Sequence, residues 1–196
     1  MPSNARTKLD TNLNNIVELT SAHVALTGGG RGAPAIANGQ RQGAAITKAG
    51  VVLLSAAFEA FVEDLFDEAL PHVFPTLSAA QLQALISQTS ERMNNADCAK
   101  IEWLYTYLNL QDCLNGITWQ KYSNTTLRKN INQMVHIRNC IAHGGALTER
   151  KKSNTPFNLL LKNLKSWETM VRSFAPRFEA KISGHIAATT GNPGPW

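Results

Sequence analysis

The chain has 196 residues, enough for one well-filled core and too few for two large ones. Hydrophobic residues make up 43% and charged residues 17%, which excludes a disordered chain, and three cysteines without a C-x-x-C pair exclude a secreted disulfide framework. We therefore expect a cytoplasmic protein. The net charge of +5 is unevenly placed: residues 121–196 hold twelve Lys/Arg and three Asp/Glu, whereas residues 1–120 hold seven and eleven. This asymmetry favours a polyanionic partner for the C-terminal part.

Hydrophobic periodicity predicts helices throughout. A first helix is expected over residues 8–26. The Gly-rich stretch over residues 28–43 is expected to be a flexible connector or an exposed loop, and it fits no nucleotide-binding motif. A long core helix is expected over residues 44–70, ending before Pro71. Its most apolar run, residues 49–62, is too short for a bilayer span, and no signal-peptide pattern opens the chain, so we expect no membrane partner.

Helix caps predict the remaining elements. Ser78 is expected to cap one helix, a second covers residues 97–110, and Ser123–Asn124 caps a third that runs to His143 and ends at Gly144–Gly145. Thr155–Pro156 is expected to begin the last helix, which Pro176 kinks or divides. No strand is predicted, and the fold class is an all-α bundle of about five to six helices. We divide the chain into an N-terminal helix and loop (1–43), a helical domain (44–183) and a disordered tail (184–196).

The helix over residues 124–143 carries the most informative side chains. Arg138 projects from its apolar stripe, where a guanidinium is costly unless it is paired or lines a cleft or an interface. Glu59, at the edge of the long helix's apolar stripe, is the expected partner and structural support. His143 lies in the last turn, where the helix dipole favours a cationic ring, so it is either a simple C-terminal cap or a general acid/base. Asn139 lies one turn before His143, where it can orient the ring or hold a phosphate.

The string RNCIAH, residues 138–143, matches the R-x4-6-H signature of the HEPN superfamily. With the upstream VVLLSAAFEAFVEDLF (residues 51–66) and the trailing glycine, the region from about residue 44 to 171 resembles the RiboL-PSP-HEPN branch. The resemblance implies a HEPN-type helical bundle and a homodimer in which Arg138, Asn139 and His143 of both chains line one basic cleft. It also implies cleavage of RNA without a metal or other cofactor, through attack of the ribose 2′-OH and leaving 2′,3′-cyclic phosphate ends.

Basic residues near the motif are candidates for contacts with the RNA backbone, although the same residues could form an ordinary solvated surface. They are Arg128, Lys129, Arg150, Lys151 and Lys152. The resemblance also implies a setting in a toxin–antitoxin or phage-defence system, with a cognate antitoxin or defence-system protein as a further partner. Many relatives keep the fold as silent RNA-binding or scaffold modules, which is the main alternative.

Two metal sites are weaker alternatives. His136, Cys140 and His143 fall within about 60° on an ideal helix and could bind Zn²⁺ with Cys98 or Cys113. A carboxylate cluster on the long helix could bind Mg²⁺, but it is more often a solvated or interface surface; it comprises Glu59, Glu63, Asp64, Asp67 and Glu68. Trp103, Tyr105 and Tyr107 could stack on bases, although packing is their more common role.

Overall fold

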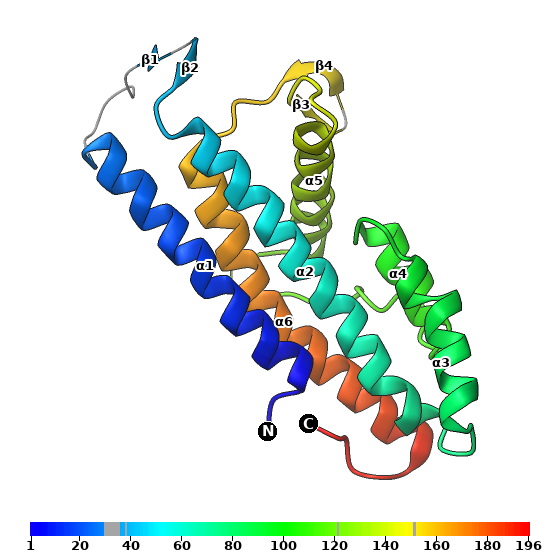
Figure 1. Ribbon diagram of the computed structural model, residues 1–196. Helices are drawn as coiled ribbons and strands as arrows, with labels where there is room; N and C mark the ends of the chain where they lie inside the picture. Colours follow the sequence, from blue (N-terminus) through cyan, green and yellow to red (C-terminus); the bar gives the residue numbers. More distant parts are fainter. Residues whose placement is uncertain (30–35, 38, 121, 151) are drawn as a thin grey trace.

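The computed structural model describes residues 1–29, 36–37, 39–120, 122–150 and 152–196, with the backbone alone for Ala37 and for residues 152–154. In this part of the chain six α-helices form one bundle, which confirms the predicted all-α class (Figure 1). They are α1 (Asn4–Thr27), α2 (Ala44–Val73), α3 (Ala79–Gln88), α4 (Cys98–Thr106), α5 (Asn124–Ala142) and α6 (Leu161–Thr190), with a 3-10 turn at Ser90–Arg92.

Two short antiparallel hairpins accompany the helices, whereas no strand was predicted. β1 (Ile36–Ala37) pairs with β2 (Gln40–Arg41), and β3 (Thr148–Glu149) pairs with β4 (Lys152–Pro156). The prediction that Thr155–Pro156 begins the last helix was therefore wrong, since Pro156 ends β4 and α6 begins only at Leu161. A proline without an N–H is equally suited to the end of an edge strand.

The three long helices α1, α2 and α6 lie side by side, and α5 packs against α2 and α6 (Figure 1). Aromatic rings fill the space between α2, α4 and α6. Phe58 packs on Phe174 at 5.6 Å between ring centroids, and Tyr105 packs on Phe178 at 4.8 Å. The Tyr105 hydroxyl donates to the Val62 carbonyl (3.0 Å), so this buried polar group is satisfied.

The helix α1 belongs to the same core and is not a separate N-terminal unit. Leu9, Leu13 and Ile16 are buried against the bundle. The start of α1 is held by two acidic side chains: Glu68 of α2 accepts from the N–H groups of Asn4 and Ala5, and Glu179 of α6 accepts from the N–H of Ser3. Carboxylates at a helix N-terminus satisfy its free N–H groups and its positive dipole end.

The C-terminal segment is also ordered, so the predicted disordered tail over residues 184–196 was wrong. The helix α6 continues past Pro176 as one element to Thr190. The Trp196 indole N–H donates to the Glu179 carbonyl (3.2 Å), and the Ser183 hydroxyl donates to the Trp196 carbonyl (2.7 Å). Both ends of the chain therefore contact Glu179, and the two termini lie close together in Figure 1.

The helix α2 is longer than predicted, because it passes Pro71 and ends at Val73. Pro71 stands in the last turn, where the loss of one backbone hydrogen bond interrupts little of the helix. Among the described residues, α2 is the one helix long and apolar enough to span a membrane by length and composition alone. Its most apolar stretch of 18 residues has a mean hydropathy of 1.7, and half of this stretch is buried inside the bundle. Its contacts with α1, α5 and α6 account for the apolar composition.

Candidate active site on helix α5

Helix α5 positions the candidate residues as predicted from its caps. The Ser123 hydroxyl accepts from the Thr126 N–H (3.1 Å), and Gly144 adopts a φ of 65° immediately after the C-cap residue His143. The buried side of the helix faces the core with Leu127, Ile131, Met134, Val135 and Ile137. Arg138, Asn139 and His143 therefore occupy the last two turns, at a solvent-accessible end of a helix whose other side is fixed by packing.

Arg138 lies in a polar cluster that joins α2, the loop before α4 and α5. Its Nη1 donates to Asn95 Oδ1 (2.7 Å) and to Asn139 Oδ1 (3.1 Å), and its Nη2 lies 3.9 Å from Glu59 Oε2. Glu59 also accepts from the Asn95 backbone N–H. Glu59 thus lies where pairing with Arg138 was expected. The Arg138 side chain remains 28% exposed, so a guanidinium on the apolar stripe is both paired and open to solvent.

Asn95 is a member of this cluster that the sequence analysis missed. It has a φ of 66°, in the left-handed region, where asparagine is among the few non-glycine residues found often. This conformation places its side-chain oxygen on Arg138 and its N–H on Glu59. The dipeptide Asn94–Asn95 before the Asp97 N-cap was the available signal of a turn, but nothing in it indicated a contact with α5.

His143 is exposed and forms the C-cap of α5, with its backbone N–H donating to the Asn139 carbonyl (3.0 Å). Within the described part of the chain its ring has no hydrogen-bond partner, so no hydrogen bond joins it to Arg138. An ideal helix separates the two residues by about 140°. A single chain therefore holds the two motif side chains in place without joining them in one catalytic pair.

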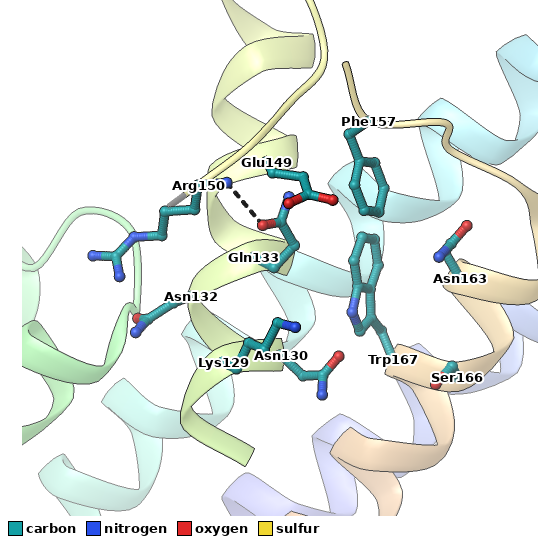
Figure 2. Close-up of a pocket in the computed structure, with 10 residues that line it drawn as sticks. All are labelled: Lys129, Asn130, Asn132, Gln133, Glu149, Arg150, Phe157, Asn163, Ser166 and Trp167. Atoms are coloured by element: carbon teal, nitrogen blue, oxygen red, sulfur yellow. Dashed lines mark hydrogen bonds between the residues drawn. The ribbon is translucent and has the colours of Figure 1, made fainter. Parts of the chain in front are cut away.

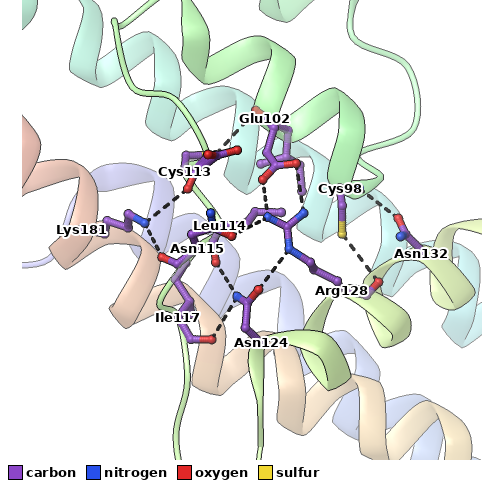
Figure 3. A network of polar contacts seen from close by, with 12 residues as sticks. Cys98, Glu102, Cys113, Leu114, Asn115, Ile117, Asn124, Arg128, Asn132 and Lys181 are labelled. Carbon is purple, nitrogen blue, oxygen red and sulfur yellow. Dashed lines mark hydrogen bonds and ion pairs between the residues drawn. The ribbon is translucent and has the colours of Figure 1, made fainter.

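Arg128 does not have the free guanidinium that a contact with the RNA backbone requires, which corrects its assignment as an RNA-binding residue. It makes a two-pronged ion pair with Glu102 of α4 and donates to Asn124 and Asn115, each at 3.1 Å (Figure 3). The hydrogen bond to Glu102 raises the pKa of Arg128. Arg128 therefore joins α5 to α4 and to the loop before α5.

The other basic candidates differ in exposure and in ion pairing. Lys129 is exposed, and Arg150 lies 3.7 Å from Asp97 with 43% of its side chain exposed. Lys152 stands in β4, and Lys151 lies outside the described residues. Lys129 and Arg150 are thus the described cations beside the motif helix that can reach a phosphate.

The alternative metal sites are not assembled. The Cys98 and Cys113 thiols are buried and donate to the carbonyls of Arg128 and Ile101, and burial raises the pKa of each to about 12. His136 Nε2 lies 3.0 Å from Thr148 Oγ1. Among the residues described, no group of three or more His, Cys, Asp and Glu side chains is placed to hold a metal ion.

The carboxylates of α2, here called the acidic row, form contacts with other segments of the same chain; the row comprises Glu59, Glu63, Asp64, Asp67 and Glu68. Asp64 pairs with Lys8 (3.0 Å), Asp67 accepts from the Ser90 hydroxyl (2.6 Å), and Glu68 caps α1. Burial, together with the neighbouring carboxylates of Glu59, Asp67 and Asp64, raises the pKa of Glu63 to about 8.

The three aromatic residues proposed for base stacking separate into two groups. Tyr105 is fully buried, whereas Trp103 and Tyr107 form an edge-to-face pair on the outside of α4, 42% and 39% exposed. Packing is therefore the role of Tyr105.

The RiboL-PSP-HEPN family model matches residues 12–180. The chain belongs to this family. The match includes most of α1, which the sequence resemblance placed outside the family region, and this agrees with the packing of α1 in the common core. No curated protein and no solved structure shows significant similarity to the chain.

Proposed function

We propose that this HEPN protein is a metal-independent endoribonuclease. In the proposed reaction a His143 imidazole takes the proton of a ribose 2′-OH, the oxygen attacks the adjacent phosphorus, and the bond to the 5′-oxygen breaks as that oxygen takes a proton from a protonated His143 imidazole. The products are a 2′,3′-cyclic phosphate and a 5′-OH end. Arg138 stabilises the charge on the phosphate, and Asn139 fixes the guanidinium.

One observation supports this proposal most directly: the three motif side chains stand at the solvent-accessible end of α5. Arg138 is held by three neighbours yet partly exposed, and His143 is exposed at the negative end of the helix dipole. A fixed cation and an exposed imidazole are the groups that a phosphoryl transition state requires from a protein that supplies no metal.

The proposed functional unit is a homodimer. Since Arg138 and His143 of one chain do not contact each other, a second copy of α5 would complete the site by presenting its own motif across a two-fold axis. The proposed substrate and partners are RNA, a second copy of the chain, and a cognate antitoxin or defence-system protein. The proposed setting is a toxin–antitoxin or phage-defence system.

A second candidate is a catalytically silent RNA-binding or scaffold module. It is favoured by the engagement of Arg138 with Glu59, Asn95 and Asn139, because an arginine so occupied can serve the fold alone.

The test is cleavage of single-stranded RNA by the purified full chain in EDTA, with analysis of the ends. We expect 2′,3′-cyclic phosphate ends from the wild type and a loss of at least about a hundredfold in rate for His143→Ala, the low end of a general acid–base contribution. His136→Ala, on the same helix but bonded to Thr148, is the matched control and should keep activity. RNA binding without cleavage would select the scaffold alternative, and equal cleavage rates for the wild type and His143→Ala would overturn the proposed role of His143.

A further inference from the structure

A pocket of about 420 Å³ opens between the polar side of α5, the β3–β4 hairpin and the first two turns of α6 (Figure 2). It lies outside the Arg138 cluster, and none of the motif residues lines it. Its volume is within the range of small-molecule sites. Its walls combine aromatic rings, amides, a carboxylate and two cations, which is not the composition of a packing defect.

Two aromatic rings form one wall of the pocket. Phe157 and Trp167 stack with their centroids 6.0 Å apart and an angle of 13° between their planes. Trp167 is only 3% exposed, whereas Phe157 is half-buried. The buried indole thus fixes the Phe157 ring, and a planar ligand can stack against that ring at little entropic cost.

Two of the amides around the pocket, those of Asn163 and Asn130, are held by the fold with one end engaged. Asn163 Oδ1 accepts from the Leu160 N–H (2.9 Å), and Asn130 Nδ2 donates to the Thr126 carbonyl (2.9 Å). Among the described residues, the Asn163 NH₂ and the Asn130 oxygen have no partner and remain available as a donor and an acceptor. Glu149 adds an exposed carboxylate acceptor. Fixed donors and acceptors beside an aromatic ring match the polar edge of a nucleobase.

Two cations border the pocket, and one of them, Arg150, also lies 3.7 Å from Asp97. Lys129 and Arg150 line the pocket and are exposed. Lys129, Gln133, His136, Cys140 and His143 follow one another at spacings of three and four residues, so the pocket and His143 lie on the same side of α5. Gln133 precedes His143 by ten residues, about 15 Å along the helix axis, a separation that a few nucleotides of single-stranded RNA can cover.

We propose that this pocket binds one unstacked nucleobase of the RNA substrate, against Phe157 and between Asn163, Asn130 and Glu149. The inference rests on the proposed function in that RNA is the ligand, and it adds a base-recognition subsite away from the cleavage site. Lys129 and Arg150 hold the adjoining phosphates.

The test compares nucleotides with a ligand that lacks the base. The full chain is titrated with the four ribonucleoside 5′-monophosphates and with ribose 5-phosphate, following the Trp167 indole N–H by NMR, assigned with Trp167→Phe. We expect at least one nucleotide to bind at least tenfold more tightly than ribose 5-phosphate and to shift this resonance. If no nucleotide binds more tightly than ribose 5-phosphate, the pocket is not a base site.

A variant that fills the pocket provides a second test of the proposal. Ser166 lines the pocket and is exposed, so Ser166→Phe fills it without removing a core contact. We expect this variant to lose nucleotide binding and to raise KM for RNA at least about tenfold with kcat nearly unchanged. Ala180→Phe adds the same ring at an exposed site of α6 outside the pocket and should behave as the wild type.

The two proposals fail separately. Nucleotide binding that is unchanged in Ser166→Phe overturns the base pocket, even if the wild type cleaves RNA in EDTA. Selective nucleotide binding that Ser166→Phe abolishes supports the base pocket, even if the wild type cleaves nothing.

Discussion

At the scale of single residues, two arginines of α5 with similar sequence surroundings have different roles. Arg128 makes four hydrogen bonds within the chain, two of them to Glu102. Arg138 makes two hydrogen bonds, to Asn95 and Asn139, and its ion pair with Glu59 is longer, at 3.9 Å. Charge counting treats both as candidate RNA contacts, but a guanidinium whose donors are already satisfied gains little from a phosphate. The partners of each arginine, not its charge, decide its role.

Arg128 and Lys129 are adjacent and provide a direct test. Arg128→Lys keeps the charge but loses the planar fork, so we expect a loss of about 1 kcal/mol in the free energy of unfolding for this partly exposed pair. RNA affinity should not change. Lys129→Gln should do the reverse, weakening RNA binding and its salt dependence without changing stability. Urea unfolding and filter binding measure the two effects; weaker RNA binding by Arg128→Lys at full stability would contradict the structural role.

At the scale of elements, the acidic row of α2 connects this helix to other segments of the bundle. Glu68 fixes the start of α1, Asp67 holds Ser90 and Glu59 holds Asn95, so one side of α2 positions three other segments. Glu63 lies within this row, between Glu59 and Asp67, and is surrounded by the same carboxylates. Its own carboxyl has no hydrogen-bond partner among the described residues. A carboxyl in that position remains protonated to a higher pH than usual.

This position predicts a pH dependence of stability. The pKa of Glu63 rises from an ordinary value of about 4.3 in the unfolded chain to about 8 in the fold, through burial first and then Glu59, Asp67 and Asp64. Between these values the folded state holds a proton that the unfolded state releases, so its contribution to stability is lost as the pH rises towards 8. Asp67, whose pKa burial raises to about 6, acts in the same direction over a narrower range.

Glu63→Gln removes the titrating group. We expect the urea midpoint of the wild type to fall between pH 5 and pH 8 relative to the variant, which should be the more stable of the two at pH 8. Glu18→Gln, at an exposed position of α1, is the control and should follow the wild type. Parallel profiles for the wild type and Glu63→Gln would contradict the prediction.

At the scale of the whole molecule, the two termini stabilise the same point of the bundle. Ser3 and Arg6 bind the Glu179 carboxylate, and Trp196 binds the Glu179 carbonyl. The Trp196 ring also packs edge-on against His72 of α2, at 5.9 Å. The last residue of the chain thus connects α6 with α2.

Deleting residues 191–196 tests this contact. Since the helix itself ends at Thr190, the deletion removes the Trp196 contacts together with the Gly191 C-cap, and we expect a loss of about 1–2 kcal/mol in the free energy of unfolding. Trp196→Ala should reproduce most of the effect, whereas the exposed Asn192→Ala should not. An unchanged urea midpoint after the deletion would show that the tail contributes nothing.

The proposed composite site is a property of two molecules. We expect sedimentation to show a dimer at micromolar concentration. Mixing Arg138→Ala with His143→Ala should recover part of the lost RNA cleavage, because a mixed dimer retains one arginine and one histidine in the shared cleft. No recovery in a mixture that forms mixed dimers would show that each chain uses its own pair.

The sequence by itself determined the local features. The apolar stripes of α2 and α5, the caps at Ser78 and Ser123, and the stop at Gly144 follow from the order of residues, because helix periodicity and capping act over a few positions. The RNCIAH motif could be recognised for the same reason, because its residues are close together in the chain. Its expected partner Glu59 could be named because an arginine on an apolar stripe requires a charge from a neighbouring helix.

Only the tertiary structure decided which polar groups meet. Asn95 joins Arg138 through a left-handed turn, Arg128 is satisfied by Glu102, and the pocket beside Phe157 forms where α5, a hairpin and α6 converge. Each of these contacts joins segments far apart in the chain. Their free energy depends on distance and burial, which no periodic pattern encodes, so the RNCIAH motif could be read from the sequence while its surroundings could not.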